Sequence, residues 1–250
     1  MVTARARRRP AEVAARTAWR VLDYGYAGWR QAAALLSRTP PGAWAHPAAR
    51  RPPEVLLLPG VWEPWRFLEP LGGALHARGH AVHVVPGLGF NGGGLPEMTE
   101  LAADRVRELD LRGAVVVAHS KGGLIGKALL GRADVRDRLR GMVAVNTPFA
   151  GSPYARWLPV PALRAFLPDD EVLTALAAQR ADHGRIVAAA TRWDPHIPGD
   201  GALPGARLVR LRTPGHFLPL CSAELRSVVA AELDRFAASH PGADGARTSR

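Results

Sequence analysis

From residue 54 onward, short apolar runs alternate with longer amphipathic segments. Each run is four or five residues long and rich in Val, Ile, Leu and Ala, so we expect buried strands. The runs are 55–58, 81–85, 114–118, 142–145, 186–190 and 208–211. Helices are expected near 65–78, 97–109, 121–131 and 222–238. Apolar strands that alternate with helices predict an α/β fold with a mostly parallel central sheet and helices on both faces.

The first 53 residues have a different pattern. Residues 11–37 carry apolar side chains at helical spacing, and this stripe consists of Leu22, Tyr26, Trp29, Ala33 and Leu36. Residues 38–53 contain five prolines and a glycine, which is typical of a linker. We therefore expect a basic helical extension with a proline-rich linker in 1–53, the α/β domain in 54–240 and a disordered tail in 241–250.

Residues 150–182 interrupt the alternation of strands and helices. They separate two expected strands by far more than a crossover helix needs, and they hold large apolar residues among four prolines. An insertion of this length after a strand predicts a helical lid or cap over a site. Trp157 and Phe166 are its candidate substrate contacts.

The net charge of +11 is unevenly distributed along the 250 residues. Residues 1–51 carry ten arginines against Glu12 and Asp23, whereas the other 199 residues carry 23 basic and 20 acidic groups. A basic excess confined to an extension, without a recognition motif, argues against a nucleic-acid partner. The single cysteine, Cys221, excludes an intramolecular disulfide. With no secretory signal and no apolar run long enough to span a membrane, this predicts a cytoplasmic protein.

The most specific motif surrounds Ser120. An expected strand ends in Ala118-His119-Ser120-Lys121-Gly122, and the chain then turns helical. Small residues on both sides permit a sharp turn that lifts the Ser120 hydroxyl clear of the sheet, which predicts a nucleophile elbow. We expect His119 to support this turn by packing. Lys121 is expected to begin the helix as a solvated cation whose backbone N–H is one oxyanion donor.

A serine nucleophile needs a base, and the base needs an orienting acid. Asp194 follows the expected strand 186–190, and His216 follows the expected strand 208–211. The chain order Ser, Asp, His is the order that hydrolases with such an elbow use, so we expect Ser120, Asp194 and His216 to form a catalytic triad. The alternatives are Asp200, Asp169 or Asp170 for the acid, and His196 or His183 for the base.

The second oxyanion donor is expected in the loop after the first strand, Pro59-Gly60-Val61-Trp62-Glu63. Gly60 permits a close approach of the backbone, so the amide of Val61 or of Trp62 can face a developing oxyanion. The indole of Trp62 is also a candidate wall of the acyl pocket.

Neither a cofactor nor a metal is expected. Gly87-x-Gly89-x-x-Gly92 matches a dinucleotide-binding fingerprint, but further glycines and Pro96 intervene before the helix that the fingerprint should open. No spacing of metal ligands stands out. The glycine-rich segment is better explained as a flexible loop beside the site.

The chain resembles the α/β-hydrolase superfamily, especially its bacterial lipase and esterase branch, over about residues 54–238. The resemblance rests on Leu-Leu-Leu-Pro-Gly at 56–60, Ala-His-Ser-Lys-Gly-Gly at 118–123, Asn-Thr-Pro-Phe-Ala-Gly-Ser-Pro at 146–153, Asp-Pro-His-Ile-Pro at 194–198 and Gly-His-Phe at 215–217. It implies the α/β-hydrolase fold, with Ser120 as nucleophile, His216 as base and Asp194 as acid. Pro-Gly at 59–60 replaces the usual His-Gly, and the sheet's first two strands have no counterpart before residue 54.

These observations predict a serine hydrolase, similar to lipases and carboxylesterases, that cleaves acyl esters with an apolar component through an acyl-enzyme. The alternatives are acyl transfer or amide or thioester cleavage on the same triad, and a non-catalytic binding protein that keeps the scaffold. The helix within residues 1–37 either packs on its own domain or contacts an anionic membrane surface.

Overall fold

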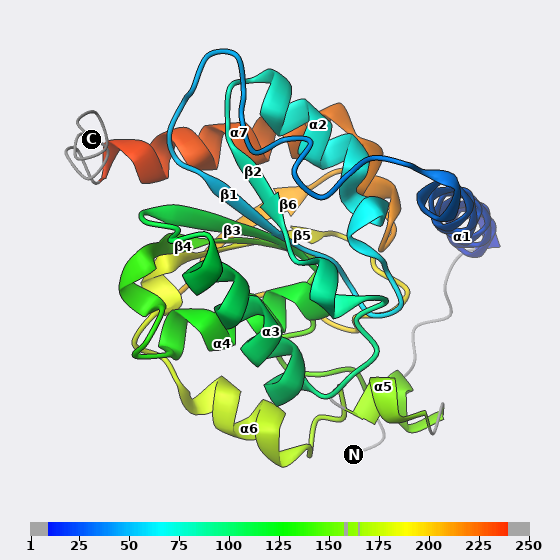
Figure 1. Cartoon of the computed structure of the whole chain (residues 1–250). Helices are drawn as coiled ribbons and strands as arrows, with labels where there is room; N and C mark the ends of the chain where they lie inside the picture. The colour runs from blue at the N-terminus through cyan, green and yellow to red at the C-terminus, as the bar shows by residue number, and fades with distance from the viewer. Residues whose placement is uncertain (1–9, 158–159, 165, 240–250) are drawn as a thin grey trace, which may run out of the picture.

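The computed structural model describes residues 10–157, 160–164 and 166–239 (Figure 1). Its sheet consists of β1 (Val55–Leu58), β2 (Val82–Val84), β3 (Ala114–His119), β4 (Leu139–Val145), β5 (Ile186–Thr191) and β6 (Arg207–Leu211). The strand order is β2-β1-β3-β4-β5-β6, and every neighbouring pair is parallel. The predicted α/β architecture with a mostly parallel sheet is therefore confirmed.

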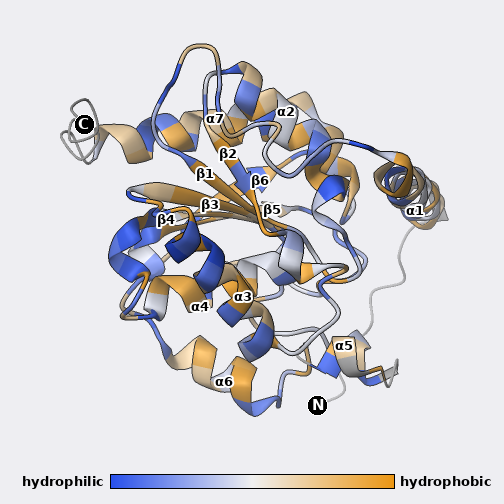
Figure 2. Ribbon diagram, viewed as in Figure 1, coloured by the Kyte–Doolittle hydropathy of each residue, from blue (hydrophilic) through white to orange (hydrophobic). Residues whose placement is uncertain are grey.

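Each face of the sheet has its own apolar core. Helices α2 (Glu69–Ala77) and α7 (Ala223–Ala238) cover one face, and α3 (Leu95–Glu108) and α4 (Lys121–Gly131) cover the other (Figure 1). Side chains alternate along a strand, so in β1 Val55 and Leu57 join the core under α2 and α7, while Leu56 and Leu58 join the other. Figure 2 shows the resulting band of hydrophobic residues along the strands.

The helix expected near 65–78 is divided in two. A 3-10 helix, Trp65–Leu68, precedes α2, which begins at Glu69. Pro70 has no N–H to donate and is tolerated only in the first turn of an α-helix, so the α-helix starts beside it.

The insertion at 150–182 contributes to two different parts of the molecule. Its first half contains the 3-10 helix Pro153–Trp157 and α5 (Pro161–Arg164). Its second half, α6 (Glu171–Ala178), buries Leu173 and Leu176 in the core beside α4. α6 is thus fixed by core packing, and a lid over the site stays a prediction for the first half of the insertion.

Helix α1 (Pro10–Leu36) packs on the domain through a face that the apolar stripe does not predict. Leu22, Trp29 and Leu36 of that stripe are 54%, 60% and 81% exposed. The buried positions of α1 are instead Asp23, Arg30 and Ala34. The neighbouring loops offer backbone amides and carbonyls to this helix, so its polar residues turn inward. The helix is correctly predicted, and Tyr26 of the stripe packs partly against the core, but Leu22, Trp29 and Leu36 point away from the domain.

No helix of the described residues is both long and apolar enough to cross a membrane. Because the strands are parallel, the loops after β1, β3, β5 and β6 leave the sheet at one edge. Ser120, Asp194 and His216 all follow strands at this edge.

Candidate active site

Ser120 lies in the turn between β3 and α4, with φ +50° and ψ −118°. A residue other than glycine rarely adopts a positive φ, and such strained positions cluster at functional sites. The start of α4 after this turn requires glycine at positions 122 and 123. A Cβ atom on Gly122 would lie 2.3 Å from the Leu58 carbonyl oxygen of β1, and one on Gly123 would lie 1.9 Å from Thr147 Oγ1. The sequence pattern predicted the need for Gly122 but not for Gly123.

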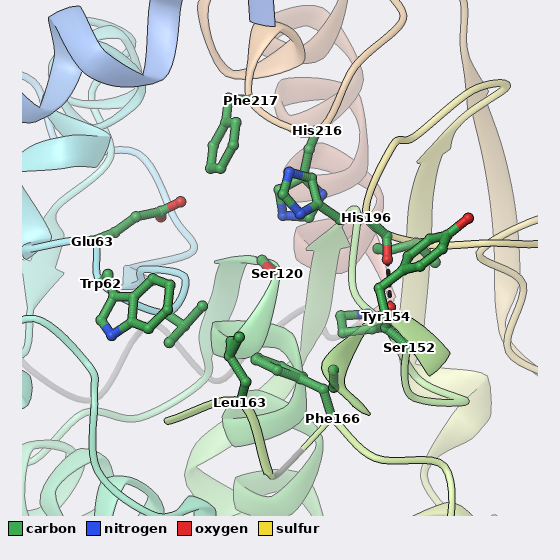
Figure 3. A pocket seen from close by; sticks show the side chains of 14 residues that line it. Trp62, Glu63, Ser120, Ser152, Tyr154, Leu163, Phe166, His196, His216 and Phe217 are labelled. Atoms are coloured by element: carbon green, nitrogen blue, oxygen red, sulfur yellow. Dashed lines mark hydrogen bonds between the residues drawn. The ribbon is translucent and has the colours of Figure 1, made fainter. Parts of the chain in front are cut away.

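Asp194 and His216 are joined by a hydrogen bond of 2.7 Å between Oδ2 of the carboxylate and Nδ1 of the ring. The other carboxylate oxygen, Oδ1, accepts hydrogen bonds from the amides of His196 at 2.7 Å and Ile197 at 3.1 Å. The carboxylate is therefore fixed on both sides. Figure 3 shows the His216 ring above Ser120, and both residues line the same pocket.

The alternative acids are engaged elsewhere. Asp170 caps α6 by accepting a hydrogen bond from the Leu173 amide. Asp169 pairs with Arg156, and Asp200 with Arg210. The structure thus brings Asp194, and none of these three, to His216.

The alternative bases lack an orienting acid. Nδ1 of His183 lies 2.6 Å from the Pro204 carbonyl oxygen, away from Ser120. His196 does line the pocket, with its ring 4.6 Å from that of His216. Burial, and then the charge of His216, lower the pKa of His196 to about 4, which makes it a poor base near neutral pH.

The pKa values of Asp194 and His216 move in opposite directions. Burial alone would lower the pKa of His216, but the charge and hydrogen bond of Asp194 outweigh it, and the pKa is raised. Burial alone would raise the pKa of Asp194, but the charge and hydrogen bond of His216 and the His196 amide lower it. The Asp194 carboxylate therefore stays ionised while the His216 ring can take up a proton.

His119 and Glu63 form a buried pair behind the elbow. Nδ1 of His119 lies 2.8 Å from Glu63 Oε1, and its Nε2 lies 3.1 Å from the His216 carbonyl oxygen. Glu63 Oε2 also accepts a hydrogen bond of 2.7 Å from the Gly60 amide. His119 thus ties the loop after β1 to the loop that carries His216. Sequence reasoning missed Glu63, although a carboxylate three residues after Gly60 was a usable cue.

The loop after β1 places both candidate oxyanion donors beside the serine. Val61 and Trp62 line the pocket with Ser120, and Trp62 has a positive φ of +60°. Glu63 already accepts the hydrogen bond of the Gly60 amide, so Val61 and Trp62 remain the candidates in this loop.

Lys121 is not the solvated cation expected from the sequence. Its side chain is fully buried, and Nζ donates to the carbonyl oxygens of Asn91 at 2.8 Å and Gly93 at 2.6 Å. Burial lowers the pKa of Lys121 to about 8. The side chain therefore holds the glycine-rich loop, while the backbone N–H stays at the start of α4 as a candidate oxyanion donor.

A mostly apolar cavity of about 180 Å³ opens in front of Ser120 (Figure 3). Trp62, Leu163 and Phe166 form its walls, so two of the predicted substrate contacts reach it. The side chain of Trp157, the third, lies outside the described residues. Ser152 also lines the cavity, and its hydroxyl donates to the His196 carbonyl oxygen at 2.7 Å.

Within the described ranges, no group of three or more His, Cys, Asp or Glu side chains could hold a metal ion. The arrangement at Ser120 is a serine hydroxyl beside a hydrogen-bonded histidine–aspartate pair and a mostly apolar cavity.

Neither a protein-family model nor a curated protein matches the sequence. Solved structures do match. The mature lipase BlEst2 of Bacillus licheniformis is 14% identical, with a TM-score of 0.61 over 75% of this chain and 95% of the lipase. An extracellular α/β-hydrolase of a Paenibacillus species is 15% identical, with a TM-score of 0.51 over 73% of this chain and 99% of the other. A hydrolase of Pseudomonas aeruginosa is 20% identical, with a TM-score of 0.50 over 74% and 89%. Likenesses at these identities show the fold alone, and the fold of this chain is that of the α/β-hydrolases.

Proposed function

We propose that this protein is a serine hydrolase that cleaves acyl esters with a small apolar acyl group. The observation that carries the proposal is the 2.7 Å bond between Asp194 and His216 in the pocket that contains the strained Ser120. The fold supports it, because hydrolases with this architecture use these residue types at these strand ends.

The proposed reaction proceeds in two halves. Ser120 Oγ attacks the ester carbonyl while His216 Nε2 takes the hydroxyl proton, and Asp194 stabilises the resulting imidazolium. The amides of Lys121 and of Val61 or Trp62 donate to the oxyanion. His216 then gives its proton to the leaving alcohol, and an acyl-Ser120 ester remains. A water molecule, deprotonated by His216, hydrolyses that ester and releases the carboxylic acid.

The size of the cavity limits the acyl group. An apolar cavity of about 150 Å³ holds one benzene molecule, and the cavity beside Ser120 measures about 180 Å³. It therefore matches a short acyl chain. Its apolar walls favour such a chain over a charged group, because they offer a charge no partner.

We expect Ser120→Ala to abolish turnover of p-nitrophenyl butyrate, with a loss of about 10⁵- to 10⁶-fold in kcat. Labelling by a fluorophosphonate probe should be lost as well, because the probe needs the activated hydroxyl. Ser152→Ala is the matched control, because the hydroxyl of this second pocket serine already donates to the His196 carbonyl oxygen, and the variant should keep labelling. Probe labelling that persists in Ser120→Ala would exclude Ser120 as the nucleophile.

The wild-type kcat/KM should rise with pH through an apparent pKa above the ordinary histidine value of about 6.5, because the base must be neutral and its pKa is raised. Asp194→Asn removes the charge that raises the pKa of His216. The acid limb should then move to lower pH, and kcat should fall by about 10⁴-fold. Asp200→Asn, at an exposed aspartate, should change neither. An equal effect of both substitutions would contradict the assignment of the acid.

A panel of p-nitrophenyl esters should show the highest kcat/KM at about four to six acyl carbons, as for a cavity close in size to benzene. The palmitate ester should react at least about 10-fold more slowly, since one methylene in an apolar pocket can change the rate about 10-fold. Phe166→Ala should move the optimum to longer chains, whereas Phe90→Ala, at an exposed phenylalanine outside the cavity, should not. A long-chain optimum in the wild type would refute the size limit.

A further inference from the structure

Helix α1 contacts both loops that carry the proposed machinery. On the oxyanion side, Gln31 Nε2 donates to the Trp62 carbonyl oxygen at 2.9 Å. Arg30 donates to the Arg66 carbonyl oxygen at 2.6 Å and to that of Phe67 at 3.2 Å. On the other side, Asp23 meets the loop that contains His216. One helix of the N-terminal extension therefore reaches both walls of the site.

Asp23 is fully buried and accepts hydrogen bonds from three consecutive backbone amides. Its Oδ2 accepts from His216 at 2.9 Å, and its Oδ1 accepts from Phe217 and Leu218 at 2.8 Å each. Gly215, with φ +102°, makes room for this contact, because a Cβ atom there would lie 2.4 Å from Asp23 Oδ1. The carboxylate is thus enclosed by the turn that carries the base.

The backbone of His216 is held from its other side as well. Its carbonyl oxygen accepts hydrogen bonds from Asn146 Nδ2 at 3.0 Å and from His119, whose Nε2 lies 3.1 Å away. Asp194 holds the ring. Of these partners, Asp23 alone binds the backbone N–H of His216, and it brings a charge-assisted acceptor. No other described residue replaces this contact.

We propose that Asp23 is a positioning residue for His216, and that α1 is therefore a structural component of the active site. This inference rests on the proposed function. A base displaced by about 1 Å can lower the rate about 10²-fold, because proton transfer depends on the approach of the ring to the serine hydroxyl.

The charge of Asp23 also acts on His216, independently of its hydrogen bonds. The ionisable groups that face His216 are Asp194 after β5, Glu63 after β1, Asp23 on α1, His119 at the end of β3, and His196. Asp194, Glu63 and Asp23 each raise the pKa of His216. Removing the carboxylate of Asp23 should therefore lower that pKa, which a purely structural role would not require.

The test compares Asp23→Asn and Asp23→Ala with Glu12→Gln, which removes an exposed carboxylate from the same helix. We expect kcat for p-nitrophenyl butyrate to fall about 10-fold in Asp23→Asn and about 10²-fold in Asp23→Ala, because asparagine keeps one acceptor. KM should change little. The acid limb of the pH profile should move to lower pH in both Asp23 variants and stay in place in Glu12→Gln.

A second readout separates this inference from the proposed function. The His216 ring resonances, followed by NMR across pH, report its pKa without any turnover. Thermal melts establish that each variant is folded at the assay temperature. A folded Asp23→Asn with the rate, acid limb and His216 titration of Glu12→Gln overturns the positioning role. A wild type that shows no labelling refutes the proposed function, and the NMR titration still decides whether Asp23 acts on His216.

The outward face of α1 presents an independent feature. From residue 18 to residue 36, its polar and charged residues Asp23, Arg30 and Gln31 turn toward the domain, and Arg20 lies over the Trp193 ring. The remaining exposed residues are apolar or small, and they are Ala18, Trp19, Val21, Leu22, Tyr24, Gly25, Gly28, Trp29, Ala32, Leu35 and Leu36. Arg20 is thus the one charged residue exposed between residues 18 and 36.

We infer that this face binds an anionic lipid surface. Residues 1–9, directly before α1, contain four arginines and no acidic residue, and residues 1–51 carry ten arginines against two acids. That charge complements anionic headgroups, while the apolar face supplies buried area. A second copy of the chain is disfavoured, because pairing through α1 would bring two such basic extensions together.

Cosedimentation of the whole protein with phosphatidylglycerol vesicles should show binding that is at least about 10-fold weaker with phosphatidylcholine or at high salt. The double variant Leu22→Ser, Trp29→Ser should lose binding at least about 10-fold. The control Phe90→Ser, Val172→Ser changes exposed apolar residues away from α1 and should keep it. Equal partitioning of both variants overturns the inference. So does a concentration-dependent dimer that only the α1 variant abolishes.

Discussion

The site depends on the contact between the turn after β3 and the backbone at the end of β1. Gly122 lies so close to the Leu58 carbonyl oxygen that a single added carbon would collide with it. This contact places the strained Ser120 beside the loop that begins at Pro59, where the candidate oxyanion donors lie. Because a protein interior is close-packed, neither backbone segment can shift to relieve such a collision. Ser120 and the loop after β1 are therefore set relative to each other by two neighbouring strands, before any side chain of the pocket contributes.

Buried charges then connect the loops that the sheet alone would leave independent. Glu63 after β1, Asp194 after β5 and Asp23 on α1 are largely or fully buried, and each carboxylate accepts hydrogen bonds from backbone amides. A buried charge without a partner costs several kcal/mol, so any movement that separates these partners is penalised. The network therefore rigidifies the surroundings of His216, and its carboxylates occupy interior positions that apolar side chains would otherwise fill.

Much of the fold and part of the candidate site follow from the sequence, because apolar periodicity and turn residues are local. The strands, the elbow at Ser120 and the positions of Asp194 and His216 after strands belong to this class. Asp23, Glu63 and the buried ammonium of Lys121 do not. Each is a polar residue whose burial depends on a partner far away in sequence, and a hydrophobic pattern assigns such residues to solvent. The orientation of α1, with Asp23 and Arg30 buried and Leu22 exposed, could not be predicted for the same reason: the partners of its polar residues are distant in sequence.

The bond between Asp23 and the His216 amide spans 193 residues and encloses most of the chain in one loop. Contacts of such separation form late, because the entropy of loop closure must be overcome before the contact is gained. During synthesis, α1 leaves the ribosome before the strands of the sheet, and Asp23 has no amide partner until residues 216–218 have been made. The candidate site is thus completed only once residues 216–218 have been made, and a nascent chain carries Ser120 well before His216 is fixed in place.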